Sequence, residues 1–175
     1  MTRLAPIAMV AALLGFLAAC LASPGMARAQ DAPLPFKVEL IDTGIYEVGG
    51  VEVRAAPGTA SGKVATLEEI RLIQITSEVP AKLGSTFGFR YRLLGVPEGP
   101  LGSLSMRALH PPMRGPDGRV TSTSSADTEV DGVRGVGEGA VAYTLSEPFE
   151  VLRGTWELQL LYKGKPVLAR TFVLK

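Results

Sequence analysis

The sequence predicts an all-β domain, an antiparallel immunoglobulin-like β-sandwich of about seven strands, preceded by a cleaved signal peptide. The first thirty residues have the composition of an export signal. The remaining chain alternates apolar and polar residues over short runs, which glycine and proline separate. No ten-residue window after the leader has a helical period, so two packed sheets are the expected way to bury the apolar faces.

The leader comprises residues 1–29. Arg3 supplies a positive start, residues 4–22 are apolar apart from single breaks, and Ala27-Arg28-Ala29 fits the small-x-small rule for signal peptidase. Cleavage after Ala29 leaves 175 − 29 = 146 residues. We therefore expect a periplasmic or secreted protein.

The same leader contains a second processing signal. Leu17-Ala18-Ala19-Cys20 forms a lipobox, in which Cys20, the only cysteine of the chain, is acylated and becomes the mature N-terminus. This alternative predicts a protein that is lipid-anchored in the cell envelope. A retained helical anchor is the third alternative, because the apolar run approaches the ~20 residues that span a bilayer. Apart from such an anchor, we expect no contact with a membrane.

The mature chain is expected to begin with a short flexible lead-in, residues 30–35, followed by a single β-sandwich domain, residues 36–175. A chain of this length buries about 70% of its unfolded surface and needs no disulfide or metal for stability. Loss of Arg3 and Arg28 leaves 18 − 2 = 16 basic against 17 acidic residues, a net charge of −1. This balance argues against nucleic acid or an anionic membrane surface as the main partner.

The first half of the domain contains three predicted strands. Residues 36–40 alternate apolar and polar, and residues 44–46 continue or bend this strand. Residues 57–62 are rich in glycine and small side chains and predict a loop. A second strand is expected over about residues 70–77. The third is the clearest: its apolar side chains share one face and its arginines the other, namely Phe87, Phe89, Tyr91 and Leu93 against Arg90 and Arg92.

The second half is expected to contain a strand at residues 104–108, which His110-Pro111-Pro112 would end because proline cannot donate to a ladder. Residues 111–139 form a polar stretch that is unusually long for a loop and can contain an edge hairpin. Residues 140–145 predict a further strand. The chain ends in a hairpin, with strands at 155–162 and 167–174 and with Trp156, Leu158, Leu160 and Tyr162 on one face.

The sequence does not predict an enzyme. A nucleophilic triad needs a base, and His110 is the only histidine of the chain. No G-x-S-x-G motif accompanies it, so we expect a histidine that packs at a turn. No catalytic residue and no cofactor are predicted.

Two groups of side chains have compositions that metals prefer. Met106, His110 and Met113 combine thioether and imidazole, the ligands that suit Cu(I). However, Met106 and His110 would lie about 13 Å apart along a strand. Residues 127–138 follow the order of a calcium loop, although Glu129 and Arg134 depart from the pattern and no helix is predicted on either side. A solvated acidic loop is the simpler interpretation.

Arg90 and Arg92 form a candidate binding patch. Both project from the face opposite the aromatic stripe, where two guanidinium groups can bind an anion. The simpler interpretation is that both are solvated on the open face of a strand.

Several segments together resemble a bacterial family known as domain of unknown function 3859. They are Gly44-Ile45-Tyr46, residues 79–84, residues 87–91, residues 94–99, and Gly154-Thr155-Trp156 with the terminal hairpin. The resemblance covers roughly residues 36–175 and is most specific over 79–99. It implies one module, and it implies no activity, cofactor or catalytic residue.

Together these features predict a non-enzymatic periplasmic or envelope module that binds an envelope protein or a glycan. The alternative is a carrier of a small ligand, calcium or copper. It would use the acidic stretch 127–138 or the group of Met106, His110 and Met113.

Overall fold

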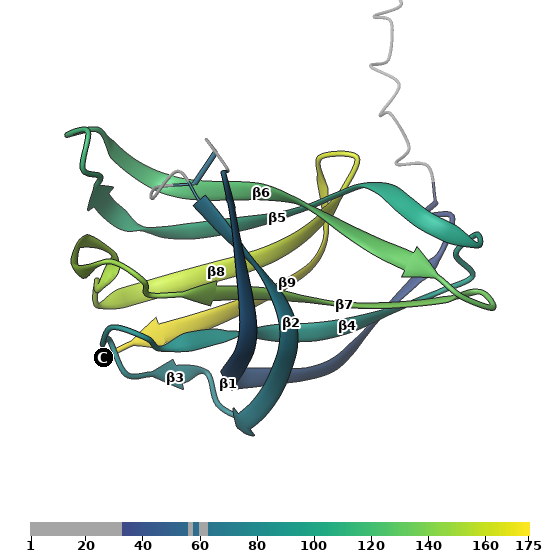
Figure 1. Ribbon diagram of the computed structural model, residues 1–175, viewed down its shortest axis with the longest axis horizontal. Helices are drawn as coiled ribbons and strands as arrows, with labels where there is room; N and C mark the ends of the chain where they lie inside the picture. Colours follow the sequence, from purple (N-terminus) through teal and green to yellow (C-terminus); the bar gives the residue numbers. More distant parts are fainter. Residues whose placement is uncertain (1–32, 56–57, 60–62) are drawn as a thin grey trace, which may run out of the picture. The chain divides into compact units, whose positions relative to one another are not determined.

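Two β-sheets face each other in the computed structural model, which describes residues 33–55, 58–59 and 63–175 (Figure 1). The four-stranded sheet has the order β2 (Lys63–Gln74), β1 (Lys37–Ala55), β4 (Thr86–Leu94) and β7 (Val136–Thr144). The five-stranded sheet has the order β3 (Glu78–Val79), β9 (Lys165–Leu174), β8 (Gly154–Tyr162), β5 (Gly99–Arg114) and β6 (Val120–Gly132). A 3₁₀ turn, η1 (Pro148–Glu150), connects β7 to β8.

This architecture confirms the predicted all-β sandwich. The described residues form nine strands rather than about seven. One addition is the two-residue β3, which pairs with β9 in parallel, whereas the other pairs are antiparallel. The other is β6, which lies within the stretch that was expected to be polar loop or edge hairpin. The predicted signal peptide and Cys20 lie outside the described residues.

The core lies between the sheets and contains the two predicted apolar stripes. Phe87, Phe89, Tyr91 and Leu93 on β4 are all 0% exposed, as are Trp156, Leu158 and Leu160 on β8. Phe87 meets both opposite strands, because its ring centroid lies 5.7 Å from that of Trp156 and 5.2 Å from that of Phe172 on β9. Full burial of such a side chain contributes about 1.5–3 kcal/mol, so these stripes hold the sheets together.

Strand β1 changes partner along its length. Residues 37–46 pair with β4, and residues 45–55 pair with β2. The switch occurs at Gly44, where a Cβ atom would lie 1.9 Å from the Gln74 carbonyl oxygen, so only glycine fits. The second half of β1 and strand β2 form a two-stranded arm that runs across the direction of the other strands in Figure 1. At the end of the arm, the Gly58 carbonyl accepts the Ser125 N–H of β6 at 2.9 Å.

The predicted end of a strand at His110 is wrong. Strand β5 continues through Pro111 and Pro112 to Arg114, but its pairing with β6 shifts register between Leu109 and Met113. The two prolines therefore interrupt the ladder without ending the strand, because an irregularity in register tolerates residues that cannot donate. In the described part of the chain, no helix has the length and hydropathy needed to cross a membrane.

Candidate functional site

Polar side chains from four elements meet inside the sandwich. They are His110 on β5, Ser124 on β6, Tyr143 on β7 and Glu150 on η1, which we call the buried polar cluster. His110 is 6% exposed, Ser124 3% and Glu150 2%. The indole of Trp156 lies against two of them, with ring centroids 5.1 Å from His110 and 5.0 Å from Tyr143.

The hydrogen bonds of His110 determine its tautomer. Its Nδ1 lies 2.9 Å from the carbonyl oxygen of Pro111, which can only accept, so Nδ1 carries the hydrogen. Its Nε2, 3.2 Å from the Ser124 hydroxyl, then accepts from that hydroxyl in the neutral ring. Both ring nitrogens of His110 are thus engaged within the protein.

Glu150 has partners for both carboxylate oxygens. Its Oε1 accepts the Tyr143 hydroxyl at 3.0 Å. Its Oε2 accepts the main-chain N–H groups of Ser146 at 2.7 Å and Glu147 at 3.0 Å. A buried carboxylate is costly unless it is hydrogen-bonded, and these three bonds meet that requirement.

Burial keeps the histidine and tyrosine of this cluster neutral. Desolvation lowers the pKa of His110, and the Pro111 carbonyl and the Glu150 carboxylate oppose this only in part. Desolvation also raises the pKa of Tyr143, with a further contribution from Glu150. The cluster therefore contains a neutral imidazole in the interior of the sandwich.

Ser124 and His110 resemble the nucleophile and general base of a catalytic triad in one respect only. Ser124 is bonded to His110, as a catalytic serine would be, but the other imidazole nitrogen meets a main-chain carbonyl rather than a carboxylate. Since Ser124 is 3% exposed, its hydroxyl is not open to a substrate. The expectation that His110 packs at a turn is wrong, because His110 lies inside β5, which continues to Arg114. Its bond to Ser124 joins β5 to β6.

Sequence reasoning missed Ser124, Tyr143 and Glu150 as members of this cluster. They lie on three different elements, and no local motif marks them. Glu150 lies between two predicted strands, in a segment for which the sequence predicts no element, whereas the fold buries its carboxylate. A cluster assembled across the sandwich could be found only from the tertiary structure.

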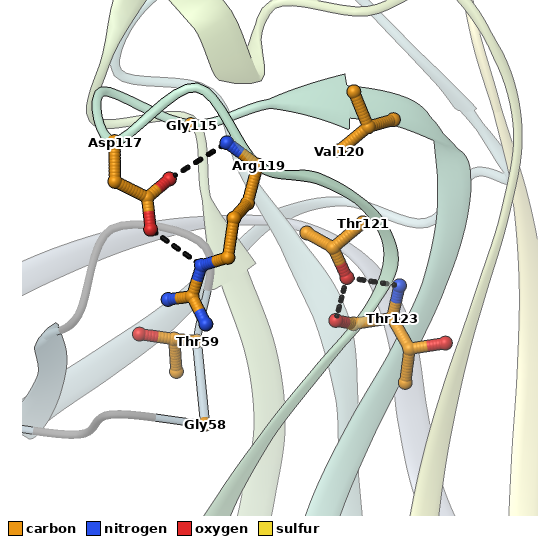
Figure 2. A pocket seen from close by; sticks show the side chains of 8 residues that line it. All are labelled: Gly58, Thr59, Gly115, Asp117, Arg119, Val120, Thr121 and Thr123. Carbon is orange, nitrogen blue, oxygen red and sulfur yellow. Dashed lines mark hydrogen bonds and ion pairs between the residues drawn. The ribbon is translucent and has the colours of Figure 1, made fainter.

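A hollow of about 240 Å³ lies on the surface where β5 turns into β6 (Figure 2). One wall comes from the end of the β1–β2 arm and the other from the β5–β6 hairpin. The lining residues are Gly58, Thr59, Gly115, Asp117, Arg119, Val120, Thr121 and Thr123. The hollow thus joins segments that belong to both sheets.

The side chains of this hollow are mostly polar. Arg119 Nε donates to Asp117 at 2.5 Å, and the Arg119 main-chain N–H donates to the same carboxylate at 3.0 Å. These bonds lower the pKa of the Asp117 carboxyl, so it stays charged. Figure 2 shows Arg119 folded over Asp117 on one side of the hollow and Thr121 with Thr123 on the other. A guanidinium, a carboxylate and hydroxyls together suit a ligand with both donors and acceptors.

Arg90 and Arg92 project from the outer face of β4, as predicted, and each meets a carboxylate. Arg90 Nε donates to Asp42 at 3.0 Å, and Tyr46 donates to the same carboxylate at 2.6 Å. Arg92 Nε donates to Glu138 at 2.7 Å. An anion at the candidate patch would have to compete with these internal partners, and its binding there stays a prediction.

Met106, His110 and Met113 all lie on β5, and the structure leaves no free imidazole nitrogen for a metal there. Met113 is 0% exposed and packs in the core, and both nitrogens of His110 are hydrogen-bonded. The described residues contain no group of three or more His, Cys, Asp or Glu side chains placed to hold a metal ion.

The acidic stretch 127–138 is not a loop. Its first residues belong to β6 and its last to β7, with a tight turn between. Asp127, Glu129 and Asp131 are exposed on one face of β6, where alternate residues lie about 7 Å apart. This extended spacing replaces the curved arrangement that a calcium loop requires.

Three comparisons relate the chain to known proteins. Residues 36–174 match the family described as "Domain of unknown function (DUF3859)". A crystal structure of an immunoglobulin-like protein from Pseudomonas aeruginosa is similar, with a TM-score of 0.55 and 26% identity, over 79% of this chain and 97% of that one. A comparison with curated proteins finds no significant match.

A structure of the Pseudomonas fluorescens alkylpurine DNA glycosylase AlkC, bound to DNA containing an abasic-site analogue, is also similar. It has a TM-score of 0.38 and 10% identity, over 57% of this chain and 28% of that one. Similarity at this level carries no argument about this chain.

The family match covers far more than half of the chain, from the start of β1 to the end of β9. The fold described above agrees with the immunoglobulin-like neighbour. The chain therefore belongs to the family of domain of unknown function 3859.

Proposed function

We propose that the mature protein is a non-enzymatic binding module of the bacterial cell envelope. The hollow beside the β5–β6 turn is its contact site. The observation that carries this proposal is that polar groups line the hollow within reach of solvent, whereas the one serine–histidine pair is buried. In immunoglobulin-like domains, loops at the ends of the sandwich often carry the binding residues.

An envelope protein or a glycan is the expected partner. Arg119 is largely exposed and presents donors, while Asp117 and the threonine hydroxyls present acceptors. A neutral partner with hydroxyl or main-chain amide groups fits this mixture better than a highly charged one.

The test uses the mature protein, immobilised and exposed to solubilised envelope proteins and to envelope polysaccharide fragments. The double variant Asp117→Ala with Arg119→Ala removes the ion pair at the hollow. The matched control, Lys37→Ala with Glu39→Ala, removes an exposed pair with the same spacing on β1. We expect the first variant to lose the captured partner and the control to retain it.

Equal capture by both variants would contradict the proposed contact site. Conversion of a captured glycan into shorter products would contradict the non-enzymatic assignment, since a binding module releases its ligand unchanged.

The envelope location has its own test. Mass spectrometry of the mature N-terminus distinguishes a chain that begins at Gln30 from one that begins at an acylated Cys20. We expect Gln30, because the small-x-small site ends at Ala29. A mature chain that retains Met1 to Ala29 in the cytoplasm would contradict the location.

A further inference from the structure

An interrupted main-chain ladder joins the outer part of the β5–β6 hairpin to the rest of these two strands. We call residues 111–123 the distal hairpin. The ladder between the two strands pairs Leu109 with Thr123 and resumes only with Met113 and Thr121. Pro111 and Pro112 lie in this gap and have no N–H to donate. Another contact must therefore hold β5 and β6 together at this level.

The His110 side chain supplies that contact. Its bond to Ser124 joins β5 to β6 next to the interrupted ladder, and its bond to Pro111 fixes the start of the distal hairpin. Within the distal hairpin, Met113 is fully buried and the turn residues are exposed. His110 thus lies at the point where the hairpin leaves the core.

The surroundings of His110 favour the neutral ring. The charged group that acts on it is Glu150 from η1, which accepts a hydrogen bond from Tyr143 of β7. Strands β6 and β8 contribute the uncharged Ser124 and Trp156. The favourable effect of Glu150 on a charged ring is smaller than the cost of burial, so the pKa of His110 is lowered.

We propose that neutral His110 holds the distal hairpin against the sandwich and that protonation of His110 in mildly acidic surroundings releases it. A charged imidazole would have to donate to Ser124 instead of accepting from it, and the buried charge is better solvated when the hairpin moves away. Six of the eight residues that line the hollow belong to the distal hairpin. An effect on ligand binding rests on the proposed function, but release of the hairpin can be measured without a ligand.

The direction of the pH effect follows from linkage. In the released state His110 has its ordinary pKa of 6.5, above that of the closed state. The released state therefore binds the proton more tightly, and its population rises as the pH falls below about 6.5. The opening equilibrium constant should rise by up to about tenfold for each pH unit until the closed state also protonates.

Two measurements on the mature protein test this. Because His110 is the only histidine, its imidazole NMR signals report one titration, and we expect a midpoint below 6.5. Native-state amide hydrogen exchange at pH 7.5 and 5.5, corrected for intrinsic rates, should show residues 113–121 opening separately from the β8–β9 ladder. That opening should be faster at the lower pH.

Two variants distinguish the effect of His110 protonation on hairpin opening from the effects of acid on other groups. His110→Gln keeps a neutral polar side chain and should abolish the pH dependence of hairpin opening. Ser124→Ala should speed hairpin exchange at pH 7.5, where His110 is neutral. The wild-type titration decides the proposal even if a variant does not fold. A midpoint at or above 6.5, a hairpin that exchanges only with the whole domain, or pH dependence that persists in His110→Gln would each overturn it.

Discussion

The Tyr91 hydroxyl is buried between the sheets and has no hydrogen-bond partner among the described residues. Its ring belongs to the apolar stripe of β4, so the sequence pattern predicts burial correctly and cannot predict the unpartnered oxygen. An unpaired buried hydroxyl costs about 1–3 kcal/mol. Nothing in the family assignment gives this oxygen a role.

Tyr91→Phe should leave the free energy of unfolding unchanged or raise it by up to about 1 kcal/mol, because it removes an unsatisfied group. Tyr143→Phe is the matched control. It removes a bond to the buried Glu150 carboxylate and should lower stability by about 1–3 kcal/mol. Urea denaturation of both variants checks the contrast, and equal losses would show that the Tyr91 oxygen has a partner.

Gly139 provides the space for the Tyr91 ring. A Cβ atom at Gly139 would lie 2.6 Å from the Tyr91 hydroxyl oxygen and 3.0 Å from Val130. Gly139→Ala should therefore destabilise the domain by about 1–3 kcal/mol. In a Tyr91→Phe background the loss should be smaller, because the nearest atom is gone. A double-mutant cycle by urea denaturation measures the coupling, and strict additivity would count against this contact.

At the scale of elements, the alternating pattern predicted strands that overlap seven of the described ones, and it predicted the buried faces of β4 and β8. The second predicted strand, about residues 70–77, is displaced, because β2 spans Lys63–Gln74. The pattern did not show that β1 extends from residue 37 to residue 55. The second half of β1 pairs with β2 alone, so its length depends on a partner that lies far along the chain. It also did not show that β5 continues through two prolines, because that requires β6 to tolerate a break in the ladder.

Gly44→Ala tests the point at which β1 changes partner. The new Cβ would collide with the Gln74 carbonyl oxygen, so one strand must move. We expect a loss of at least about 2 kcal/mol, with faster amide exchange confined to the β1–β2 arm. Gly84→Ala is the control, because its Cβ would meet nothing within 4 Å. Its left-handed backbone alone should cost about 1–2 kcal/mol and leave the arm unaffected.

At the scale of the whole molecule, the buried histidine makes stability depend on pH. The pKa of His110 is lower in the folded than in the unfolded chain, where it is near 6.5. The unfolded chain therefore binds more protons below that pH, and stability falls as the pH falls.

The pKa of Asp42 is lowered by its bonds to Arg90 and Tyr46. Its contribution is thus lost only at more acidic pH, below its usual 3.8.

Between pH 7.5 and 4.5, the free energy of unfolding of the wild type should decrease by up to about 1.4 kcal/mol per pH unit. The steepest change should begin near pH 6.5. His110→Gln should be nearly flat over the same range, since no other histidine exists. Urea denaturation at intervals of half a pH unit measures both curves. If the free energies of unfolding of the wild type and of His110→Gln fell in parallel, the pH dependence would come from carboxylates and not from His110.

The sequence by itself determined the class of fold, the two apolar stripes and the final hairpin. These depend on alternation along single strands, which is a local property. Only the tertiary structure decided where His110, Ser124, Tyr143 and Glu150 meet, and which turn forms a hollow with the end of the β1–β2 arm. Those contacts join strands that are distant in sequence. The residues next to a side chain in the sequence do not determine which partner it meets on the opposite sheet.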